Sequence, residues 1–378
     1  MQGQSIWKNI GPDKTPGGFF RESSWCFFIF SPVHQDVDGI GANHTTIKGN
    51  FKMKKTILTG VILGAGLLLA GCGQQATANK KTVSIGILQV VQHGSLDQAR
   101  KGFKAGLQKE LKAHGSKLKV KYRYLNAQGD QSNLNTMSQQ LVQQKNDLLV
   151  GIATPAAQAL AKKTTSIPTL VTAVTDLKAA GLVKSDTKPQ TNVSGTSDLM
   201  PVGKQLQLLK NMATGNKPLG MMYNSSEENS VLQVKIARAY AKKHHIDLKV
   251  VSATSTNDVA SVLAGLTGKI SGLYLPTDNL MASAMKTIGQ KATAAKLPVV
   301  TGSIEMAEDG GTATYGLNYY ELGEQTGKMA YQVLVKKQKP QTMAVQTADK
   351  LHLYVNKSNA NAIGIKPSSI KPSSIKQP

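Results

Sequence analysis

Small polar and acidic residues gather at four places where an apolar run of the sequence gives way to a helical pattern. They are Thr154, Pro155 and Ala156; Asp176; Asn224, Glu228, Asn229 and Ser230; and Thr277, Asp278 and Asn279. Free N–H groups at the start of a helix bind anions, and carboxylates bind cations. The mixture therefore suits a zwitterion. Each place also has a plainer explanation, because Ser, Thr, Asp and Asn are the usual caps of helix N-termini.

No constellation of residues in the sequence indicates catalysis or metal binding. A G-x-S-x-G elbow, a P-loop and a C-x-x-C pair are all missing. His244 and His245 end a basic helical segment with no Cys or carboxylate at metal-ligand spacing. His93 is either a cleft residue or an ordinary loop residue. We expect no enzyme activity, no metal and no cofactor.

The elements that must position these residues alternate along the chain from residue 82 onward. The strand-like run "TVSIGILQV" precedes a segment in which Ala99, Phe103, Leu107 and Leu111 recur at four-residue spacing, and the pairing then repeats. Such alternation predicts an α/β fold with parallel sheets and right-handed crossovers. The series restarts after residue 196, which predicts two lobes.

Each lobe is expected to be built from two separate segments of the chain. Residues 82–196 with about 317–340 form lobe 1, and 197–316 with about 341–356 form lobe 2. Residues 357–378 are expected to be a C-terminal tail, and its Pro-, Ser- and Lys-rich end, residues 363–378, is expected to be disordered. Ligands of open α/β sheets bind beyond the carboxyl ends of the strands, so the four polar places should face a cleft between the lobes.

The segment before residue 82 is typical of an exported lipoprotein. Lys54 and Lys55 precede an uncharged stretch of about 15 residues, too short to span a bilayer as a helix. Leu69-Ala70-Gly71-Cys72 resembles a lipobox, in which the cysteine thiol receives the lipid. We expect residues 53–71 to be a signal peptide and 72–81 a linker from the anchor. Residues 1–52 lack apolar periodicity and are expected to be an untranslated leader, with translation starting at Met53, or a disordered extension.

The charge of the chain argues against nucleic acid as a partner. Residues 1–71 hold seven basic and four acidic residues, so their removal lowers the formal charge from +23 by three, to +20. After residue 71 the only arginines are Arg100, Arg123 and Arg238, and arginine is the residue suited to bidentate base and phosphate contacts. A solvated lysine surface beside an anionic cell envelope fits better. Because no cysteine pair remains, no disulfide is expected.

An ordered set of short segments resembles one known family. The segments are "HGSLDQARKGF", "NAQGD", "LVQQKNDLLVGIATPAAQALA", "AVTD", "AGLV", "NVSGTSD", "YNSSEENSVLQV", "PTDN" and "LNYYELGEQTG". In this order, over about residues 82–345, they look like the ABC-transporter substrate-binding lipoproteins of the tryptophan/tyrosine uptake type.

The resemblance implies a two-lobed periplasmic-binding-protein fold, type I-like, hinged to close over an amino acid, with an aromatic one expected. It also implies delivery to a membrane permease with its ATPase, a lipid anchor at Cys72 on the outer face of a Gram-positive cell membrane, and action as a monomer. Two positions depart from the family pattern. Asp176 is followed by Leu177 instead of proline, and Asn318 replaces an aspartate that could have paired with a ligand ammonium group.

Our hypothesis for the site combines the residue pattern at the helix starts with the family resemblance. With Thr154 as N-cap and Pro155 at the first helical position, the amide groups of Ala156 and Ala157 stay free for a ligand carboxylate. Asp278 or Asp176 faces the ammonium group, and Asn224 to Ser230 closes from the other lobe. Tyr223, Tyr319 and Tyr320 either flank an aromatic ligand or belong to the core. The competing hypothesis is a ligand sensor or surface adhesion protein on the same scaffold, since fold does not determine function.

Overall fold

The structure is a computed structural model that describes residues 81–371 of the chain. The predicted leader, the signal peptide and the lipid attachment at Cys72 lie outside the described residues. No helix within the described range is long and apolar enough to cross a membrane.

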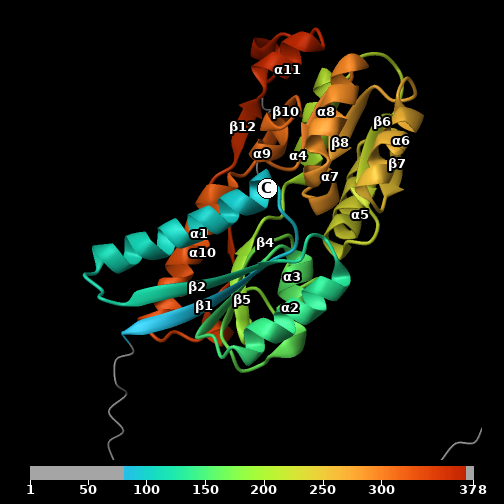
Figure 1. The fold of residues 1–378 in the computed structure, drawn as a ribbon. Helices are drawn as coiled ribbons and strands as arrows, with labels where there is room; N and C mark the ends of the chain where they lie inside the picture. Colours follow the sequence, from blue (N-terminus) through green and yellow to red (C-terminus); the bar gives the residue numbers. More distant parts are fainter. Residues whose placement is uncertain (1–80, 372–378) are drawn as a thin grey trace, which may run out of the picture. The chain divides into compact units, whose positions relative to one another are not determined.

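Lobe 1 is built on a six-stranded sheet in which every neighbouring pair of strands is parallel. Its strands, in the order β11-β5-β4-β3-β1-β2, are β1 Thr82–Gln89, β2 Lys119–Asn126, β3 Leu148–Ile152, β4 Thr169–Val174, β5 Val193–Ser197 and β11 Gln346–Thr347. Its helices are α1 Gly94–Ala113, α2 Gln131–Gln143, α3 Thr154–Lys163 and α10 Tyr319–Leu334, with the 3-10 turn η1 Pro340–Thr342. Helices α1 and α10 pack together on one face, and α2 and α3 on the other (Figure 1). The inner strands β3, β4 and β5 are buried throughout because helices cover both faces.

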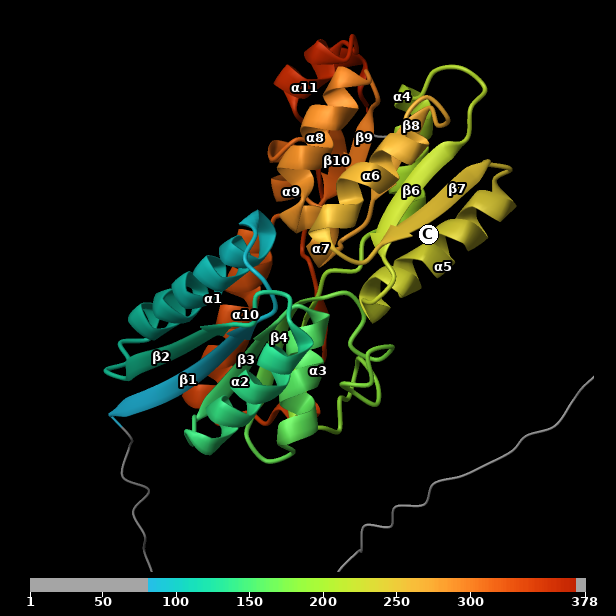
Figure 2. The same cartoon turned by 45° about the vertical axis from the view of Figure 1, so that its right-hand side comes forward.

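Lobe 2 repeats this plan with a second six-stranded sheet (Figure 2). Its strands, in the order β12-β10-β9-β8-β6-β7, are β6 Leu219–Asn224, β7 Leu248–Ala253, β8 Gly272–Leu275, β9 Val299–Thr301, β10 Ala313–Gly316 and β12 His352–Val355. Its helices are α4 Val202–Met212, α5 Glu228–Lys243, α6 Thr256–Leu266, α7 Asn279–Ser283, α8 Met285–Ala294, α9 Ile304–Glu308 and α11 Lys357–Ala362, followed by η2 Pro367–Ser369. Only β12 runs antiparallel to its neighbour, β10. The predicted α/β fold with two parallel sheets is confirmed.

The chain passes between the two sheets three times, after β5, after β10 and after β11. The second passage, between Gly316 and Tyr319, was predicted. The prediction that residues 341–356 belong to lobe 2 is wrong for their first part, because Gln346–Thr347 pairs with β5 in lobe 1. The Ser194 hydroxyl also donates to the Met343 carbonyl at 2.7 Å. This short strand covers an edge of β5 that would otherwise expose unpaired backbone groups.

The C-terminal tail folds against lobe 2 as far as residue 371, so the prediction of a disordered end is wrong for residues 363–371. The Asn356 side chain caps α11 by accepting from the Asn359 amide at 3.1 Å. Ala360 and Ile370 are buried in the apolar core of lobe 2. With Ile363, which is also buried, they make three apolar side chains over eleven residues. That is too few to show a period in sequence, yet enough to hold the segment against a preformed core.

Helices α1 and α10 approach so closely that their backbones touch. A Cβ atom on Gly102 would lie 2.0 Å from the Tyr320 carbonyl oxygen, and one on Gly323 would lie 2.1 Å from the Ala99 carbonyl oxygen. Gly106 and Gly327, one helical turn further along, meet the opposite backbone in the same way. Only glycine permits this approach. The contact joins the first helix of the fold to the helix that follows the second passage between lobes.

Candidate functional site

The two lobes make direct hydrogen bonds where the carboxyl ends of their parallel strands meet. His93 Nε2 lies 3.4 Å from Asn279 Oδ1, and the Ser95 and Ser303 hydroxyls are 3.0 Å apart. Further out, Gln158 Nε2 donates to Glu228 Oε2 at 2.8 Å. The lobes are therefore closed on one another in this structure.

A small cavity remains between the closed lobes. Its lining residues are His93, Ser95, Leu96, Ala173, Thr175, Asp198 and Tyr319 from lobe 1 and the crossings, and Asn229, Thr277, Asp278, Asn279, Ala282 and Met306 from lobe 2. Its volume is about 10 Å³, room for about one water molecule. An amino acid is far larger, so admitting one requires the lobes to separate or rearrange.

Several buried polar atoms that line this cavity have no hydrogen-bond partner in the described part of the protein. They are His93 Nδ1, Asp198 Oδ1, Asn229 Oδ1 and Thr277 Oγ1. Buried polar atoms are nearly always paired, because an unpaired one loses its bonds to water without compensation. Four such atoms from both lobes around one cavity indicate a site that pairs them with a ligand.

Asp198 is the acid that the sequence reasoning missed. It follows β5, is almost fully buried, and its Oδ2 accepts a hydrogen bond from the Tyr319 hydroxyl while Oδ1 has no partner. Burial raises the pKa of Asp198 to about 6, against the opposing effect of the Tyr319 hydrogen bond. An ionised, desolvated carboxylate with one open oxygen is suited to an ammonium group. The available signal in sequence was its place directly after a strand, without a helix start to cap.

The two acids predicted to face an ammonium group have different positions. Asp278 reaches the cavity, but its Oδ2 accepts from the Asn224 amide at 2.6 Å and its Oδ1 from the Met281 amide at 2.9 Å. It therefore holds the start of α7 against β6. Burial raises its pKa. Asp176 does not line the cavity, and its Oδ1 caps a turn by accepting from the Ala179 amide at 2.8 Å.

The start of α3 differs from the predicted cap in a way that changes which donors are free. Ala153, with φ of 78°, is the N-cap; Thr154 is the first helical residue and Pro155 the second. The Ala157 amide bonds to the Ala153 carbonyl at 3.0 Å, so the prediction that it is free is wrong. The Ala156 amide donates to no acceptor in the described residues, and the buried Thr154 hydroxyl has no partner. These two donors remain for an anion, although neither residue lines the cavity of the closed lobes and only Pro155 of this segment lines the adjoining hollow.

An unpredicted carboxylate organises the polar residues of lobe 2. Glu227 accepts from Asn224 Nδ2 at 3.0 Å, Asn229 Nδ2 at 3.3 Å and Asn279 Nδ2 at 2.5 Å. Burial, and secondarily the charge of Asp278, raise its pKa to about 7. Asn229 also donates to the Ser230 hydroxyl at 3.3 Å. The predicted amides therefore lie at the site, and Glu227 fixes the direction in which each points.

Asn318 does not reach the cavity. Its Oδ1 caps α10 by accepting from the Tyr320 amide at 2.9 Å and the Glu321 amide at 3.2 Å. The sequence interpretation was that Asn318 removes a negative charge that could pair with the ligand ammonium group. Because residue 318 does not line the cavity, that charge would not have faced the ligand there. Among the three candidate tyrosines, Tyr319 lines the cavity, whereas Tyr223 and Tyr320 do not.

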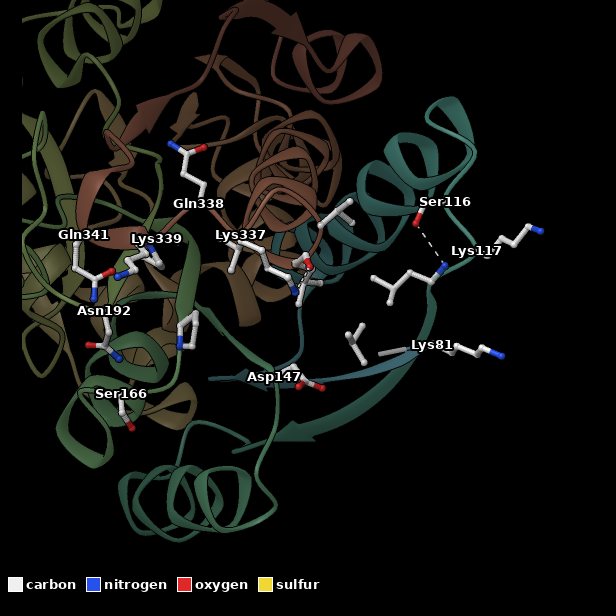
Figure 3. Close-up of a pocket in the computed structure, with 17 residues that line it drawn as sticks. Lys81, Ser116, Lys117, Asp147, Ser166, Asn192, Lys337, Gln338, Lys339 and Gln341 are labelled. Carbon is white, nitrogen blue, oxygen red and sulfur yellow. Dashed lines mark hydrogen bonds between the residues drawn. The ribbon is translucent and has the colours of Figure 1, made fainter. Parts of the chain in front are cut away.

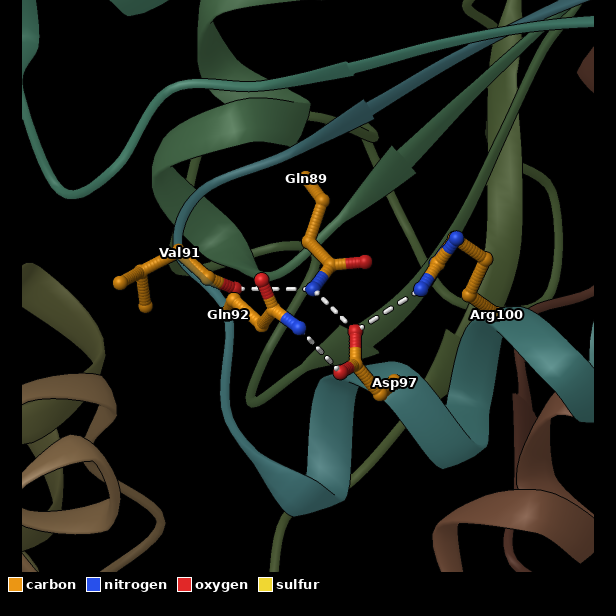
Figure 4. A network of polar contacts seen from close by, with 5 residues as sticks. All are labelled: Gln89, Val91, Gln92, Asp97 and Arg100. Carbon is orange, nitrogen blue, oxygen red and sulfur yellow. Dashed lines mark hydrogen bonds and ion pairs between the residues drawn. The ribbon is translucent and has the colours of Figure 1, made fainter.

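Two local features position the lobe 1 side of the site: a hydrogen-bond network between β1 and α1, and an irregularity in β4. Gln89 donates to the Val91 carbonyl at 2.9 Å and to Asp97 Oδ1 at 3.0 Å, and Arg100 donates to the same oxygen at 3.0 Å (Figure 4). This network fixes the turn from β1 into α1, which carries His93. A register shift in β4, with Ala173 at φ of 58°, aims the end of that strand into the cavity.

A larger hollow of about 740 Å³ adjoins the cavity, and Asn279 lines both. Its apolar lining residues are Val90, Val91, Leu134, Pro155, Ala159 and Leu280. Glu228 lies at its exposed margin, together with Gln158. In the described part of the chain no group of three or more His, Cys, Asp or Glu side chains is placed to hold a metal ion.

Replacing Glu228 with Gln should weaken ligand binding by no more than about threefold, because an exposed pair contributes under about 1 kcal/mol. The expected change is faster ligand release, measured by stopped-flow fluorescence. A loss of more than about thirtyfold would instead place Glu228 in contact with the ligand, as the sequence predicted.

Binding of a zwitterion should weaken as the pH falls through the pKa of Asp198, about 6. The carboxylate must be ionised to hold an ammonium group, and a bound ammonium lowers its pKa, so binding releases a proton and is favoured at higher pH. Affinity should fall by up to about tenfold per pH unit below about pH 6. Calorimetry in buffers of different ionisation enthalpy measures the affinity and the number of protons released on binding. An affinity that does not change with pH, with no proton release, contradicts this role of Asp198.

Comparison with known proteins identifies relatives of the whole described fold. The profile of the family "ABC transporter substrate binding protein" matches residues 84–370. The chain is 36% identical over 322 residues to a tyrosine-binding protein of Clostridioides difficile, covering 82% of this chain and 92% of that protein. A solved ABC domain in complex with L-Trp from Streptococcus pneumonia is 39% identical, with a TM-score of 0.71, over 78% of this chain and 99% of that one. A ligand-free, open substrate binding protein with adhesive properties from Clostridium difficile is 40% identical, with a TM-score of 0.59, over 78% and 97%.

Proposed function

Because the chain belongs to the family of ABC transporter substrate binding proteins, we propose that it captures an aromatic amino acid outside the cell and delivers it to an ABC permease. The observation that carries the ligand class is the cavity between the lobes, where Asp198 Oδ1 and three other buried polar atoms have no protein partner. The family is one of binding proteins, in agreement with the expectation of binding without catalysis. The tyrosine-binding relative and the L-Trp complex support the choice of an aromatic amino acid.

The ligand backbone is assigned to the cavity by its charges. The ammonium group binds Asp198 Oδ1, and Asn229 Oδ1 supplies a second acceptor from lobe 2. The carboxylate binds the Ala156 amide and the Thr154 hydroxyl at the start of α3, where the helix dipole adds to the attraction. Thr277, with its unpaired hydroxyl, completes the contacts from lobe 2.

The aromatic side chain is assigned to the apolar part of the adjoining hollow, whose lining is mixed. Val90, Leu134, Pro155 and Leu280 line that space, and Asn279 lies where it meets the cavity. Burying an aromatic side chain stabilises a complex by roughly 25 cal/mol per Å² of apolar area removed from water. The hollow of about 740 Å³ has room for a large ring, and its apolar lining residues, which lie among polar ones such as Lys162, Glu228 and Thr254, supply the surface that such a ring would bury.

Ligand binding is proposed to shift an equilibrium between open and closed lobes. The TM-score is 0.71 with the L-Trp complex but 0.59 with the ligand-free open relative, although identity and coverage are nearly equal. A difference in lobe arrangement accounts for such a gap. The direct bonds between lobes, such as Ser95 to Ser303, stabilise the closed arrangement.

A second candidate function is adhesion at the cell surface. One relative that is 40% identical is described as a substrate binding protein with adhesive properties. The two functions are compatible, because an adhesive face can lie outside the cleft. Adhesion that persists in a variant unable to bind ligand would separate them.

Calorimetric titration of the twenty amino acids into a fragment of residues 75–378 tests the proposal. That range forms one compact unit, and every apolar core cluster of the described residues lies within it. Binding confined to tryptophan, tyrosine or phenylalanine is expected, with contraction of the particle in solution scattering. Flat traces for all three, or strong binding of small aliphatic amino acids alone, would contradict it.

The lipid anchor is part of the same proposal and has its own test. The lipobox-like Leu69-Ala70-Gly71-Cys72 motif motivates it. Growth with a labelled fatty acid should label the full chain at the membrane, and Cys72→Ser should abolish the label while leaving amino-acid binding intact. Labelling that survives this substitution would remove Cys72 from the proposal.

A further inference from the structure

A second large hollow lies in lobe 1, away from the site between the lobes. Its volume is about 670 Å³. Val83, Leu118, Pro168, Val333 and Leu334 contribute apolar lining, and Lys81, Lys117, Lys337 and Lys339 contribute charge. All four lysines are exposed. Figure 3 shows Lys81 and Lys117 extending from one end of the hollow, Lys339 at the other, and Lys337 between them.

Positive charge dominates this hollow. Asp147 is the one acidic residue that lines it, against four lysines. Its Oδ2 accepts from the Ser84 amide at 2.8 Å and from the Ser84 hydroxyl at 3.3 Å. The carboxylate therefore also bonds to strand β1. Lys337 Nζ donates to the Leu334 carbonyl at 2.8 Å. An ammonium on a flexible four-carbon stem can redirect to an anion, and it does so without the fixed geometry that arginine needs.

The hollow lies at the edge of the sheet opposite the amino-acid site. Lining residues precede five strands: Lys81 before β1, Leu118 before β2, Asp147 before β3, Pro168 before β4 and Asn192 before β5. The cavity between the lobes is lined instead by residues at or beyond the carboxyl ends of β1, β4 and β5. Since these strands are parallel, the two surfaces face opposite directions.

The start of the described chain ties this edge to the N-terminal segment. Lys81 lines the hollow and precedes β1 directly. The nine residues that follow Cys72, up to and including Lys81, can span at most about 32 Å even when fully extended. If Cys72 carries the lipid, this lysine-rich edge cannot move far from the membrane surface.

We propose that this basic hollow, defined by Lys81, Lys117, Lys337 and Lys339, docks on anionic phospholipid headgroups of the membrane that holds the lipid anchor. That this hollow lies beside the membrane rests on the proposed lipid anchor. Its affinity for anionic headgroups does not, because it comes from the four lysines of the folded protein. Docking there points the cleft toward the solution that supplies the amino acid, and delivery to a permease in the same membrane then requires the protein to leave the docked position. Anionic membranes attract clustered lysines strongly at short range, and salt screens that attraction.

Sedimentation of residues 75–378 with lipid vesicles tests the affinity without any anchor. Binding is expected to phosphatidylcholine vesicles that contain phosphatidylglycerol, and not to phosphatidylcholine alone. Changing all four lysines of the hollow to Gln should lower the partition coefficient at least roughly tenfold. The matched control changes Lys242, Lys249, Lys269 and Lys291, four exposed lysines of lobe 2, and should cost less than about threefold.

Equal losses in the two variants would show attraction by net charge alone and overturn the proposal, as would equal binding to uncharged vesicles. Orientation gives an independent readout, because residues 75–378 contain no cysteine. A fluorophore on Gln338→Cys, in the hollow, should be quenched by spin-labelled lipid, and one on Ala264→Cys, in α6, should not. Amino-acid binding should be unchanged in all these variants, so failure here is distinguishable from failure of the proposed ligand.

Discussion

Replacing Asp198 with Asn should weaken binding of the aromatic amino acid at least about 100-fold, or about 3 kcal/mol. The side chain keeps its shape, but the partner of the ligand ammonium loses its charge in a site that excludes water. The protein itself should remain folded, because burial already raises the pKa of this carboxyl to about 6 and so opposes its charged form. Calorimetric titration gives the affinity, and thermal unfolding without ligand gives the stability.

Asp176→Asn is the matched control, since the sequence alone made the two acids hard to tell apart. Asp176 caps a turn at the surface of lobe 1 and does not line the cavity. Its substitution should change affinity by less than about twofold and lower stability by about 1 kcal/mol at most. If Asp176→Asn proved as damaging as Asp198→Asn, or if Asp198→Asn bound normally, the assignment of the ammonium subsite would be wrong.

Replacing Gly102 with Ala should lower the free energy of unfolding by about 3 kcal/mol, at the upper end of what overpacking usually costs. The new methyl would lie 2.0 Å from the Tyr320 carbonyl oxygen, and backbone cannot rotate away as a side chain can. Helices α1 and α10 would have to separate, which also disturbs Tyr319 at the start of α10. Urea unfolding followed by circular dichroism measures the change.

Gly265→Ala is the control for the helical position itself. Gly265 lies in α6, and a Cβ there would meet nothing within 4 Å. Alanine should therefore stabilise the protein by up to about 1 kcal/mol, because it favours the helix. Should Gly102→Ala unfold at the same urea concentration as the parent protein, the close contact of the two helices would not be a feature of the folded protein in solution.

The α1–α10 contact also bears on closure of the lobes. Tyr319 reaches from α10 to Asp198 through its hydroxyl, and its amide donates to Glu305 Oε1 of lobe 2 at 2.9 Å. Movement of α10 would shift both contacts together. We therefore expect Gly102→Ala to weaken ligand binding as well as stability, whereas Gly265→Ala leaves binding unchanged.

The sequence by itself determined the plan of the protein because that plan rests on local, repeated signals. Strand-length apolar runs alternating with helical periods specify parallel sheets, and the restart after residue 196 specifies a second lobe. The loops at the carboxyl ends of the strands were identifiable for the same reason. Thr277, Asp278 and Asn279, with Asn229, do line the cavity between the lobes.

Only the tertiary structure decided which of these polar residues keep a hydrogen-bonding atom without a protein partner, and so available to a ligand. Asp278 and Asn318 are occupied by backbone amides, and Glu227 collects three asparagine side chains. Asp198 keeps one oxygen, Oδ1, without a partner in the described residues, while Tyr319, 121 residues away along the chain, donates to the other. Capping and ligand binding use the same residue types, so sequence spacing cannot separate them. The difference lies in contacts between residues that are distant in sequence, which are made only when both lobes have folded and met.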